Sequence, residues 1–404
     1  MNSDRRRFLA ALPAAGFLSR LAGAAQTPTR TDPLGVRADF PAAEESLYLD
    51  SAYITPMPLP VVEAGRAFTE SKSRRPISLG DMLQRTDQVR AQFARFIGAG
   101  PEEIEFLFST SEGENILARA LDVKRGENVV VDELHYNTSF VLYRHLEKTT
   151  GVELRIVKAR DGAVRALDFE PLVDRRTRLL SVAWVSHQNG FRHDMRPLAD
   201  LAHRHGAWLY ADAVQAAGMF SIDVKASGVD VMTTGTYKWL LGSYGVAPFY
   251  VRGDLLERIP PDRMGALHVE RELPDHRYEI YKTAKKFEYA TLAFGPVYQL
   301  GAALHYLERV GVHRIETHTV GLAGELARGL RERGLNVLTP VGNRSSIVAF
   351  RNPADAATTR AVLDRARARV SLRENATQIR VSPALFNTSD DVRRFLDVAD
   401  ELKR

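Results

Sequence analysis

The chain has 404 residues, 45% of them hydrophobic, so it is long enough to bury a large core. Its formal net charge is only +5, and no basic patch is interleaved with aromatic residues, so nothing in it indicates nucleic-acid binding. It contains no cysteine, which excludes a disulfide framework, thiolate metal sites and any mechanism that uses a protein thiol.

The first 25 residues have the three-part layout of a bacterial export signal. The pair Arg5 and Arg6 precedes a modest apolar run and an Ala-Gly-Ala-Ala stretch typical of a cleavage site. Arg20 interrupts the apolar run, which makes the segment too short to span a membrane. We predict that residues 1–25 are a twin-arginine signal, read by twin-arginine export machinery, that directs the protein to the periplasm or beyond. A disordered basic tail is the alternative.

After this segment the pattern alternates helices with strands. Residues 26–54 are predicted to be a Pro/Thr-rich linker and an N-terminal segment. Helices are predicted at 86–100, at 111–121 behind Ser/Thr caps, and at 195–206. Apolar strands are predicted at 103–110, 127–137, 178–190, 207–218, 229–235 and 246–252. Strands that are apolar on both faces and alternate with amphipathic helices favour an α/β fold, so we predict a large domain with a mainly parallel sheet over residues 55–290.

The remainder, residues 291–404, is predicted to be a smaller C-terminal α+β domain. Two helices joined by a short break are expected within 296–334. Short strands are predicted at 335–340, 345–350 and 378–383. No segment of this part is long and apolar enough to span a bilayer, so we expect no stable membrane span.

Polar residues follow five of the predicted strands. They are Ser109, Thr110 and Ser111; His135 and Asn137; Ser186, His187 and Asn189; Asp212 and Gln215; and Thr234, Thr236, Tyr237 and Lys238. Because parallel α/β sheets bind ligands at the C-terminal ends of their strands, we expect these side chains to converge on one site.

The residue types suit three parts of one cofactor. Hydroxyls and free N–H groups at a helix start suit a phosphate. An aspartate that leaves a buried strand can hold the positive charge of a ring nitrogen, and a shielded lysine can lose its proton and attack a carbonyl. Phosphate, ring nitrogen and aldehyde together indicate pyridoxal 5'-phosphate. Taken singly, Lys238 would be a surface lysine, Asp212 a buried cap and His135 an ordinary loop histidine.

Several ordered motifs resemble the class V aminotransferase family of fold type I pyridoxal-phosphate enzymes, in the branch of isopenicillin-N-epimerase-like and cysteine-desulfurase-like proteins. The motifs are "YLDSAYITPMP", "STSEGENILARAL", "ELHYN", "VSHQNG", "YADAVQAAG", "TGTYKWLLGSYG", "KFEYATLAF" and "IRVSPALFNTSDDV". The resemblance covers nearly everything after the linker. It implies an enzyme that acts on a small-molecule amino acid or a related amine-carboxylate.

The resemblance also implies roles at the cofactor ring. Lys238 would form the aldimine with pyridoxal phosphate and then move the substrate α-proton. Asp212 would pair with the pyridinium nitrogen, and His135 would stack on the ring face. Gln215 would form a hydrogen bond near the ring hydroxyl.

Further residues would hold the phosphate and the substrate. Thr110 and Ser111 would bind the phosphate, with Thr236 or Tyr237 as a further donor. Thr291, in "FEYATLAF", matches a position that reaches the phosphate of the neighbouring subunit, which implies a homodimer with shared active sites.

A substrate carboxylate would be bound by Arg380, with Arg373 as a weaker second candidate. Arg380 could instead be a structural ion-pair partner. Either His187 or Asn189 would stand near the ring hydroxyl, and the sequence leaves both open.

Two departures from the family pattern narrow the reaction. Tyr237 occupies the position before the lysine where many relatives carry histidine, and the missing cysteine excludes a desulfurase that forms a persulfide on the protein. An aminotransferase and an epimerase are the main hypotheses. A β-elimination lyase that needs no thiol is an alternative, and a pyridoxal-phosphate-binding protein without turnover is the rival from another class. His203 and His205 resemble a metal pair but lie at a predicted helix end, and we predict no metal site.

Overall fold

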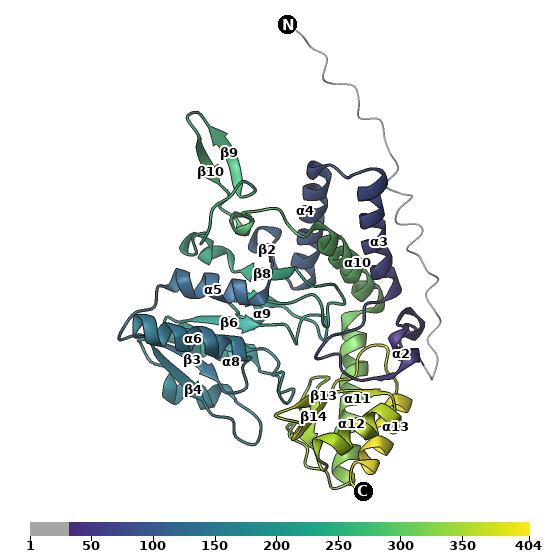
Figure 1. The fold of residues 1–404 in the computed structure, drawn as a ribbon. Coiled ribbons are helices and arrows are strands. Elements are labelled where there is room, and N and C mark those ends of the chain that lie inside the picture. The colour runs from purple at the N-terminus through teal and green to yellow at the C-terminus, as the bar shows by residue number, and fades with distance from the viewer. Residues whose placement is uncertain (1–31) are drawn as a thin grey trace.

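The computed structural model describes residues 32–404, and the predicted signal at 1–25 therefore lies outside the described residues. Figure 1 shows a central sheet with helices packed on both of its sides and a smaller C-terminal unit below it. The predicted architecture, a large α/β domain followed by a smaller α+β domain, is confirmed at the level of fold class.

The central sheet has seven strands. In spatial order they are β2 (Ile104–Leu107), β8 (Ala247–Val251), β7 (Val231–Thr233), β6 (Trp208–Asp212), β5 (Thr177–Ala183), β3 (Asn128–Asp132) and β4 (Glu153–Val157). The pairs among β7, β6, β5, β3 and β4 are all parallel, whereas β8 runs antiparallel to both of its neighbours. The sheet is thus mainly parallel, as predicted, and the carboxyl ends of its parallel strands meet at one edge.

Helices cover both faces because alternate strand residues point to opposite sides. Val129 and Val131 of β3 pack into one core with helices α5 (Thr110–Leu121) and α6 (Asn137–Thr150). Val130 packs into the opposite core. That second core is built with α4 (Leu79–Phe96), α8 (Met195–Arg204) and α10 (Phe294–Val310).

The C-terminal unit packs helices against a three-stranded antiparallel sheet. The strands are β11 (Val348–Arg351), β14 (Gln378–Val381) and β13 (Ser371–Arg373), in that order. The helices are α11 (Val312–Glu332), α12 (Ala356–Arg365) and α13 (Ser389–Glu401). The strand predicted at 335–340 is wrong, because the segment forms only one isolated bridge, between Val337 and Phe350.

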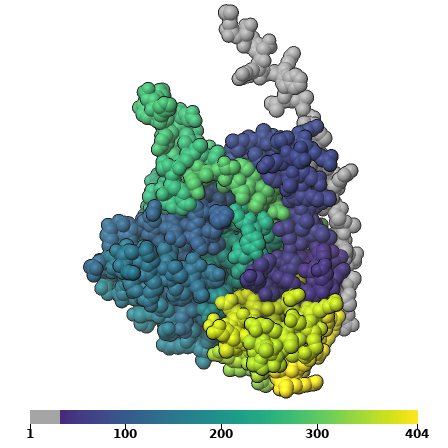
Figure 2. Space-filling model, viewed as in Figure 1, coloured from purple at the N-terminus to yellow at the C-terminus, as the bar shows by residue number. Residues whose placement is uncertain are grey.

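The remaining helices and strands are short or peripheral. They are α2 (Ala42–Glu45), β1 (Leu47–Tyr48), α3 (Leu59–Arg74), α7 (Ala166–Phe169), α9 (Val224–Ser227), β9 (Val269–Leu273), β10 (Arg277–Ile280) and β12 (Ala368–Arg369). The β9–β10 hairpin projects from the body of the molecule in Figures 1 and 2.

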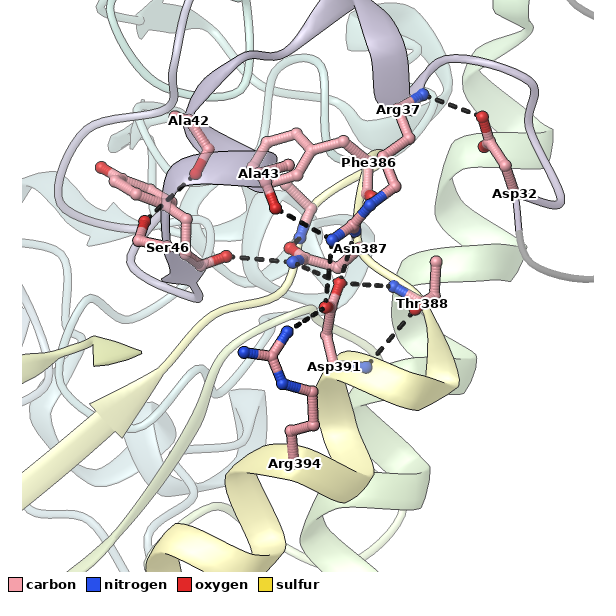
Figure 3. Close-up of polar contacts among 12 residues, drawn as sticks. Asp32, Arg37, Ala42, Ala43, Ser46, Phe386, Asn387, Thr388, Asp391 and Arg394 are labelled. Atoms are coloured by element: carbon pink, nitrogen blue, oxygen red, sulfur yellow. Dashed lines mark hydrogen bonds and ion pairs between the residues drawn. The ribbon is translucent and has the colours of Figure 1, made fainter. Parts of the chain in front are cut away.

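Residues 32–55, here called the N-terminal strap, pack against the C-terminal unit. Strand β1 of the strap pairs in parallel with β12, and Figure 2 shows the purple strap against the yellow end of the chain. Arg37 anchors the strap, since its guanidinium donates to both carboxylate oxygens of Asp391 at 2.7 and 3.2 Å and to the carbonyls of Phe386 and Ala43 (Figure 3). The strap therefore continues from this anchor toward the centre of the molecule.

Two segments pack against parts of the chain that are distant in sequence. Helix α10 packs on α3 and α4, beside the large domain, whereas the strap lies with the C-terminal unit. The predicted division at residue 290 stays a prediction. Within residues 32–404, no helix combines the length and apolarity that crossing a membrane requires.

Candidate active site

Lys238 lies just beyond β7 with its amine almost fully enclosed. Only 9% of the residue is exposed. The pKa of Lys238 is lowered from 10.5 to about 8, first by burial and then by the positive charge of Arg380, against the opposing effect of Asp212. The charges of Asp212 and Arg380 both act on Lys238, so these three residues lie near one another.

The loop that carries Lys238 is fixed by hydrogen bonds on both sides. Gly242 N–H donates to the Thr236 carbonyl at 2.8 Å. The buried Thr236 hydroxyl contacts the backbone carbonyls of Ser243 and Val246. Because a hydroxyl has a single proton to donate, Thr236 holds the loop instead of facing an anion.

Tyr237 forms part of an aromatic wall beside the lysine. Its ring stacks on Tyr244 with centroids 4.5 Å apart, and its ring centroid lies 5.6 Å from the Lys238 Nζ. Burial raises the pKa of Tyr237 to about 12, so its hydroxyl is a neutral donor. Its carbonyl accepts a hydrogen bond from Thr55 N–H at 3.3 Å, which ties the N-terminal strap to the lysine loop.

Asp212 is the last residue of β6. Its Oδ1 accepts a hydrogen bond from Val214 N–H at 2.9 Å, and no described residue donates to Oδ2. Gln215 follows in the next turn, where its amide donates to the Ala52 carbonyl and accepts from Trp239 Nε1, both at 2.8 Å. One N–H and one lone pair of the Gln215 amide remain for a ligand.

His135 is fully buried at the end of β3. Its Nδ1 accepts a hydrogen bond from Tyr136 N–H at 2.7 Å, and its Nε2 lies 2.9 Å from the Ser181 hydroxyl. The imidazole is therefore held at both nitrogens, so its flat faces, and not its edges, are what it can offer to a ligand.

The start of α5 is a cradle for an anion. Ser109 is the N-cap and accepts a hydrogen bond from Glu112 N–H at 3.4 Å, which confirms the predicted cap. Thr110 and Ser111 follow, and within residues 32–404 their hydroxyls donate to no protein group. Free donors at a helix N-terminus suit a phosphate.

Thr291 is exposed on the surface beside the start of α5. It lines a cavity of about 340 Å³ together with Phe108 and Glu112, next to the start of α5. Within the described chain, Thr291 makes no contact with Lys238. Its predicted contact with the cofactor phosphate of a second subunit therefore stays a prediction.

Arg380 stands opposite the lysine on β14. One guanidinium nitrogen donates to the His187 carbonyl and another to Ser371 Oγ, both at 2.8 Å, and Asp50 Oδ1 lies 3.7 Å away. Burial, followed by the charge of Arg373, lowers the pKa of Arg380 to about 10. The buried Nε has no partner among the described residues, which is the condition expected of a group that awaits a ligand.

His187, not Asn189, faces this cluster. The ring of His187 meets Tyr136 edge to face at 4.9 Å, and its buried Nδ1 has no hydrogen-bond partner within the described chain. Burial lowers the pKa of His187 to about 2, and Arg373 contributes to the shift, so the ring is neutral. The orphaned Nδ1 therefore points to a ligand with a donor or acceptor at that place.

Asn189 is used for structure instead. Its Nδ2 donates to the Gly162 carbonyl at 2.7 Å, its Oδ1 accepts from Phe191 N–H at 3.0 Å, and its carbonyl accepts from Thr339 at 2.8 Å. His203 contacts the buried carboxylate of Asp230 at 2.9 Å. In the described part of the chain no group of three or more side chains could hold a metal ion.

The sequence reading missed two acidic residues of the site. Asp50, in the strap, accepts a hydrogen bond from Ser371 at 2.6 Å, and burial raises its pKa. Glu114 is buried on α5, four residues before Ala118 and seven before Leu121, on the apolar stripe of that helix. A glutamate within such a stripe is the sequence signal that could have identified it.

This chain is similar to several known proteins. The family model described as Aminotransferase class-V matches residues 47–395. A probable cysteine desulfurase of Methanothermobacter thermautotrophicus is 30% identical over 394 residues, which covers 91% of this chain and 97% of that protein.

Two solved structures have a similar fold. The cofactor-free structure of cysteine desulfurase from Thermococcus onnurineus superposes with a TM-score of 0.84 at 26% identity, covering 93% of this chain and 99% of that one. A C-DES mutant with glycine covalently linked to its pyridoxal-phosphate cofactor superposes with a TM-score of 0.83 at 20% identity, covering 90% and 99%, which shows a shared fold.

Proposed function

The chain belongs to the class V aminotransferase family, and from that premise we propose that it is an aminotransferase whose amino-acid substrate binds through its carboxylate to Arg380. Family membership makes it a pyridoxal-phosphate-dependent enzyme. The reaction and the residue roles below are our proposal. The observation that supports them most strongly is the buried amine of Lys238, which has a pKa of about 8 and feels both an acidic group, Asp212, and a basic group, Arg380.

The residues present fit pyridoxal phosphate at each of its polar groups. The free donors of Thr110 and Ser111 suit the phosphate, and Asp212 Oδ2 suits a protonated ring nitrogen. Lys238 is the amine that can bind the aldehyde covalently. His187 Nδ1 is a buried acceptor without a partner in the described chain, so it can take a hydrogen bond from the ring hydroxyl.

When bound, pyridoxal phosphate draws electrons from the substrate and so weakens its Cα–H bond. Lys238 Nζ is placed to take that proton. A base works best when its pKa lies near the working pH, and burial has moved the lysine most of the way there. Arg380 and Arg373 orient the substrate carboxylate, since the unpaired Nε of Arg380 and its planar fork suit two oxygens.

The arrangement favours transamination over epimerisation. One amine can take a proton from Cα and return it to the neighbouring carbon on the same face. Epimerisation needs a donor on the opposite face, where we place His135. Both ring nitrogens of His135 are engaged, by Tyr136 N–H and by Ser181, so that side offers no free proton.

Sulfur transfer through the protein is not proposed. The relatives named cysteine desulfurase share the fold and the family, but this chain has no cysteine to carry a persulfide. A β-elimination lyase that needs no thiol remains as an outcome of the test below.

The test is a product screen. The purified full chain, loaded with pyridoxal phosphate, is incubated with D- and L-amino acids, with and without a keto acid, and the products are identified. A new amino acid formed only with keto acid supports the proposal. Inversion without keto acid would show an epimerase, a released β-substituent would show a lyase, and a cofactor spectrum that responds to no amino acid would show a protein without turnover. Lys238→Ala is the control.

We further propose a homodimer exported through the twin-arginine pathway. The exposed side chains of Phe108 and Tyr244 border the active site, where a second subunit could cover them and receive Thr291. Sedimentation of the purified chain tests the dimer. Changing Arg5 and Arg6 to lysine should leave the protein in the cytoplasm, and undiminished export would reject the proposed signal.

A further inference from the structure

A carboxylate is buried between helix α5 and the central sheet, close to the proposed cofactor site. Glu114 is 4% exposed. Its Oε1 accepts a hydrogen bond from Ser181 Oγ at 2.9 Å, and its Oε2 accepts one from Ser139 Oγ at 2.8 Å. A buried carboxylate is tolerated only when its oxygens are satisfied, and here two hydroxyls from β5 and α6 satisfy them.

The same Ser181 hydroxyl connects Glu114 to His135. His135 Nε2 lies 2.9 Å from Ser181 Oγ, so three buried groups form one chain of hydrogen bonds from α5, through β5, to the end of β3. All three residues are at most 4% exposed. A buried chain of this kind polarises its members and fixes their orientation.

The direction of donation along this chain follows from one backbone group. Tyr136 N–H donates to His135 Nδ1 at 2.7 Å, so Nδ1 carries no proton and Nε2 must carry it. Nε2–H then donates to Ser181, and the Ser181 hydroxyl donates to Glu114. The reverse order would need Ser181 to donate to Nε2, which would place the ring proton on Nδ1, against the Tyr136 N–H.

Other ionisable groups face Glu114 from the sheet and from α6. Burial raises its pKa, and the carboxylate of Asp212 acts in the same direction, whereas His135 and the two serine hydroxyls favour the charged form. Tyr143 of α6 and Tyr210 of β6 lie nearby, and burial keeps both phenols neutral by raising their pKa values. Of these groups, His135 is the one that connects Glu114, through Ser181, to the proposed cofactor site.

We propose that Glu114, acting through Ser181, is a positioning residue that holds the imidazole of His135 in one orientation and one tautomer, with the proton on Nε2. The inference rests on the proposed function, in which that ring stacks on the cofactor. When both ring nitrogens are engaged and the ring is neutral, its π-face can lie against the positively charged pyridinium. That arrangement is attractive. Neither Glu114 nor Ser181 needs to touch the cofactor for this.

The experiment uses the full chain with histidine labelled by ¹⁵N, with and without pyridoxal phosphate. The His135 ring signals are assigned by their loss in His135→Gln. Three variants separate the roles. Ser181→Ala interrupts the chain, Glu114→Gln keeps its shape and removes its charge, and Thr319→Val is the control, because the buried Thr319 hydroxyl on α11 has no hydrogen-bond partner among the described residues.

In the wild-type chain we expect the proton on Nε2, in a signal protected from exchange. Ser181→Ala should abolish that protection and raise the dissociation constant of pyridoxal phosphate about tenfold, the size of effect of one hydrogen bond. Glu114→Gln should keep the signal, shift it toward that of a weaker hydrogen bond and raise the dissociation constant less. Thr319→Val should change neither.

Three results would overturn the inference: a proton on Nδ1 in the wild-type chain, unchanged signals and affinity in both Ser181→Ala and Glu114→Gln, or an equal loss in Thr319→Val. If a variant fails to fold, the wild-type tautomer decides. A wild-type chain that bound no pyridoxal phosphate would refute the proposed function, and the cofactor-free ring signals would still test the chain of hydrogen bonds.

Discussion

Burial changes the chemistry of Lys238, and this can be measured in the cofactor-free chain. The lysine pKa is lowered to about 8, so the reactive neutral amine becomes the main form as the pH rises through that value. We predict that the rate at which borohydride traps a carbonyl compound on Lys238 rises with pH around a midpoint near 8, as read by mass spectrometry. Arg380→Gln should raise the midpoint, since it removes a positive neighbour, and a midpoint at the ordinary 10.5 would contradict the prediction.

Arg380 should affect substrate binding more than turnover. Arg380→Lys keeps a positive charge but loses the planar fork, so we predict that KM for the amino acid rises about tenfold or more, with a smaller change in kcat. Steady-state kinetics checks this. Arg196→Lys, in an exposed ion pair with Asp200, is the control and should change neither constant. An unchanged KM in Arg380→Lys would assign the guanidinium to structure alone.

At the residue scale, the sequence located side chains whose role follows from their position at a strand end. Lys238, Asp212 and the start of α5 are of this kind, and the charge of Asp212 acts on Lys238 in the structure. The choice between His187 and Asn189 depended on which side chain already forms hydrogen bonds within the protein. The Asn189 amide does, and its partner Gly162 lies far from it in sequence. Glu114 was missed because its partners on β5 and α6 become neighbours only after folding.

At the scale of elements, the turn after β6 supports the lysine loop through a close backbone contact. Gly218 has a φ of +91°, and a Cβ there would lie 2.2 Å from the Trp239 carbonyl oxygen, next to Lys238. We predict that Gly218→Ala lowers the free energy of unfolding by about 2–4 kcal/mol, from steric overlap and left-handed backbone strain, and weakens cofactor absorbance.

Gly206 offers the matched control. Its φ is +74°, but a Cβ would meet nothing within 4 Å. Gly206→Ala should therefore cost about 1–2 kcal/mol from backbone strain and leave cofactor binding unchanged. Urea unfolding measures both variants, and equal losses of cofactor binding would refute the role given to the contact with Trp239.

Strands with continuous apolar runs were predicted from the sequence, the edge strand β2 among them, whereas charged edge strands were not. Strand β4 carries Glu153 and Arg155 at the sheet edge, and the β9–β10 hairpin is mostly charged and exposed. Charged edges discourage pairing with other chains, but they remove the apolar pattern by which a strand is recognised. The strap's pairing of β1 with β12 joins positions 47 and 368, a distance along the chain that no local pattern reports.

At the scale of the whole molecule, the N-terminal strap links the C-terminal unit to the lysine loop, and Arg37 is its anchor. Arg37→Ala removes hydrogen bonds to Asp391 and to the carbonyls of Phe386 and Ala43, so we predict a loss of about 1.5–3 kcal/mol in the free energy of unfolding. Arg66→Ala, which breaks an exposed pair with Glu63, should cost at most about 0.5 kcal/mol. Equal effects in urea unfolding would deny the strap an anchoring role.

The strap also sets an order of events during synthesis. Arg37 pairs with a residue 354 positions later, and Ala52, whose carbonyl holds Gln215, donates its N–H to the hydroxyl of Ser382, 330 positions later. A growing chain still attached to the ribosome lacks these partners until almost its last residues have emerged, so the wall around Lys238 closes only on the finished polypeptide. A chain that stops short of residue 391 would therefore hold the lysine and the helix start but leave the strap unanchored.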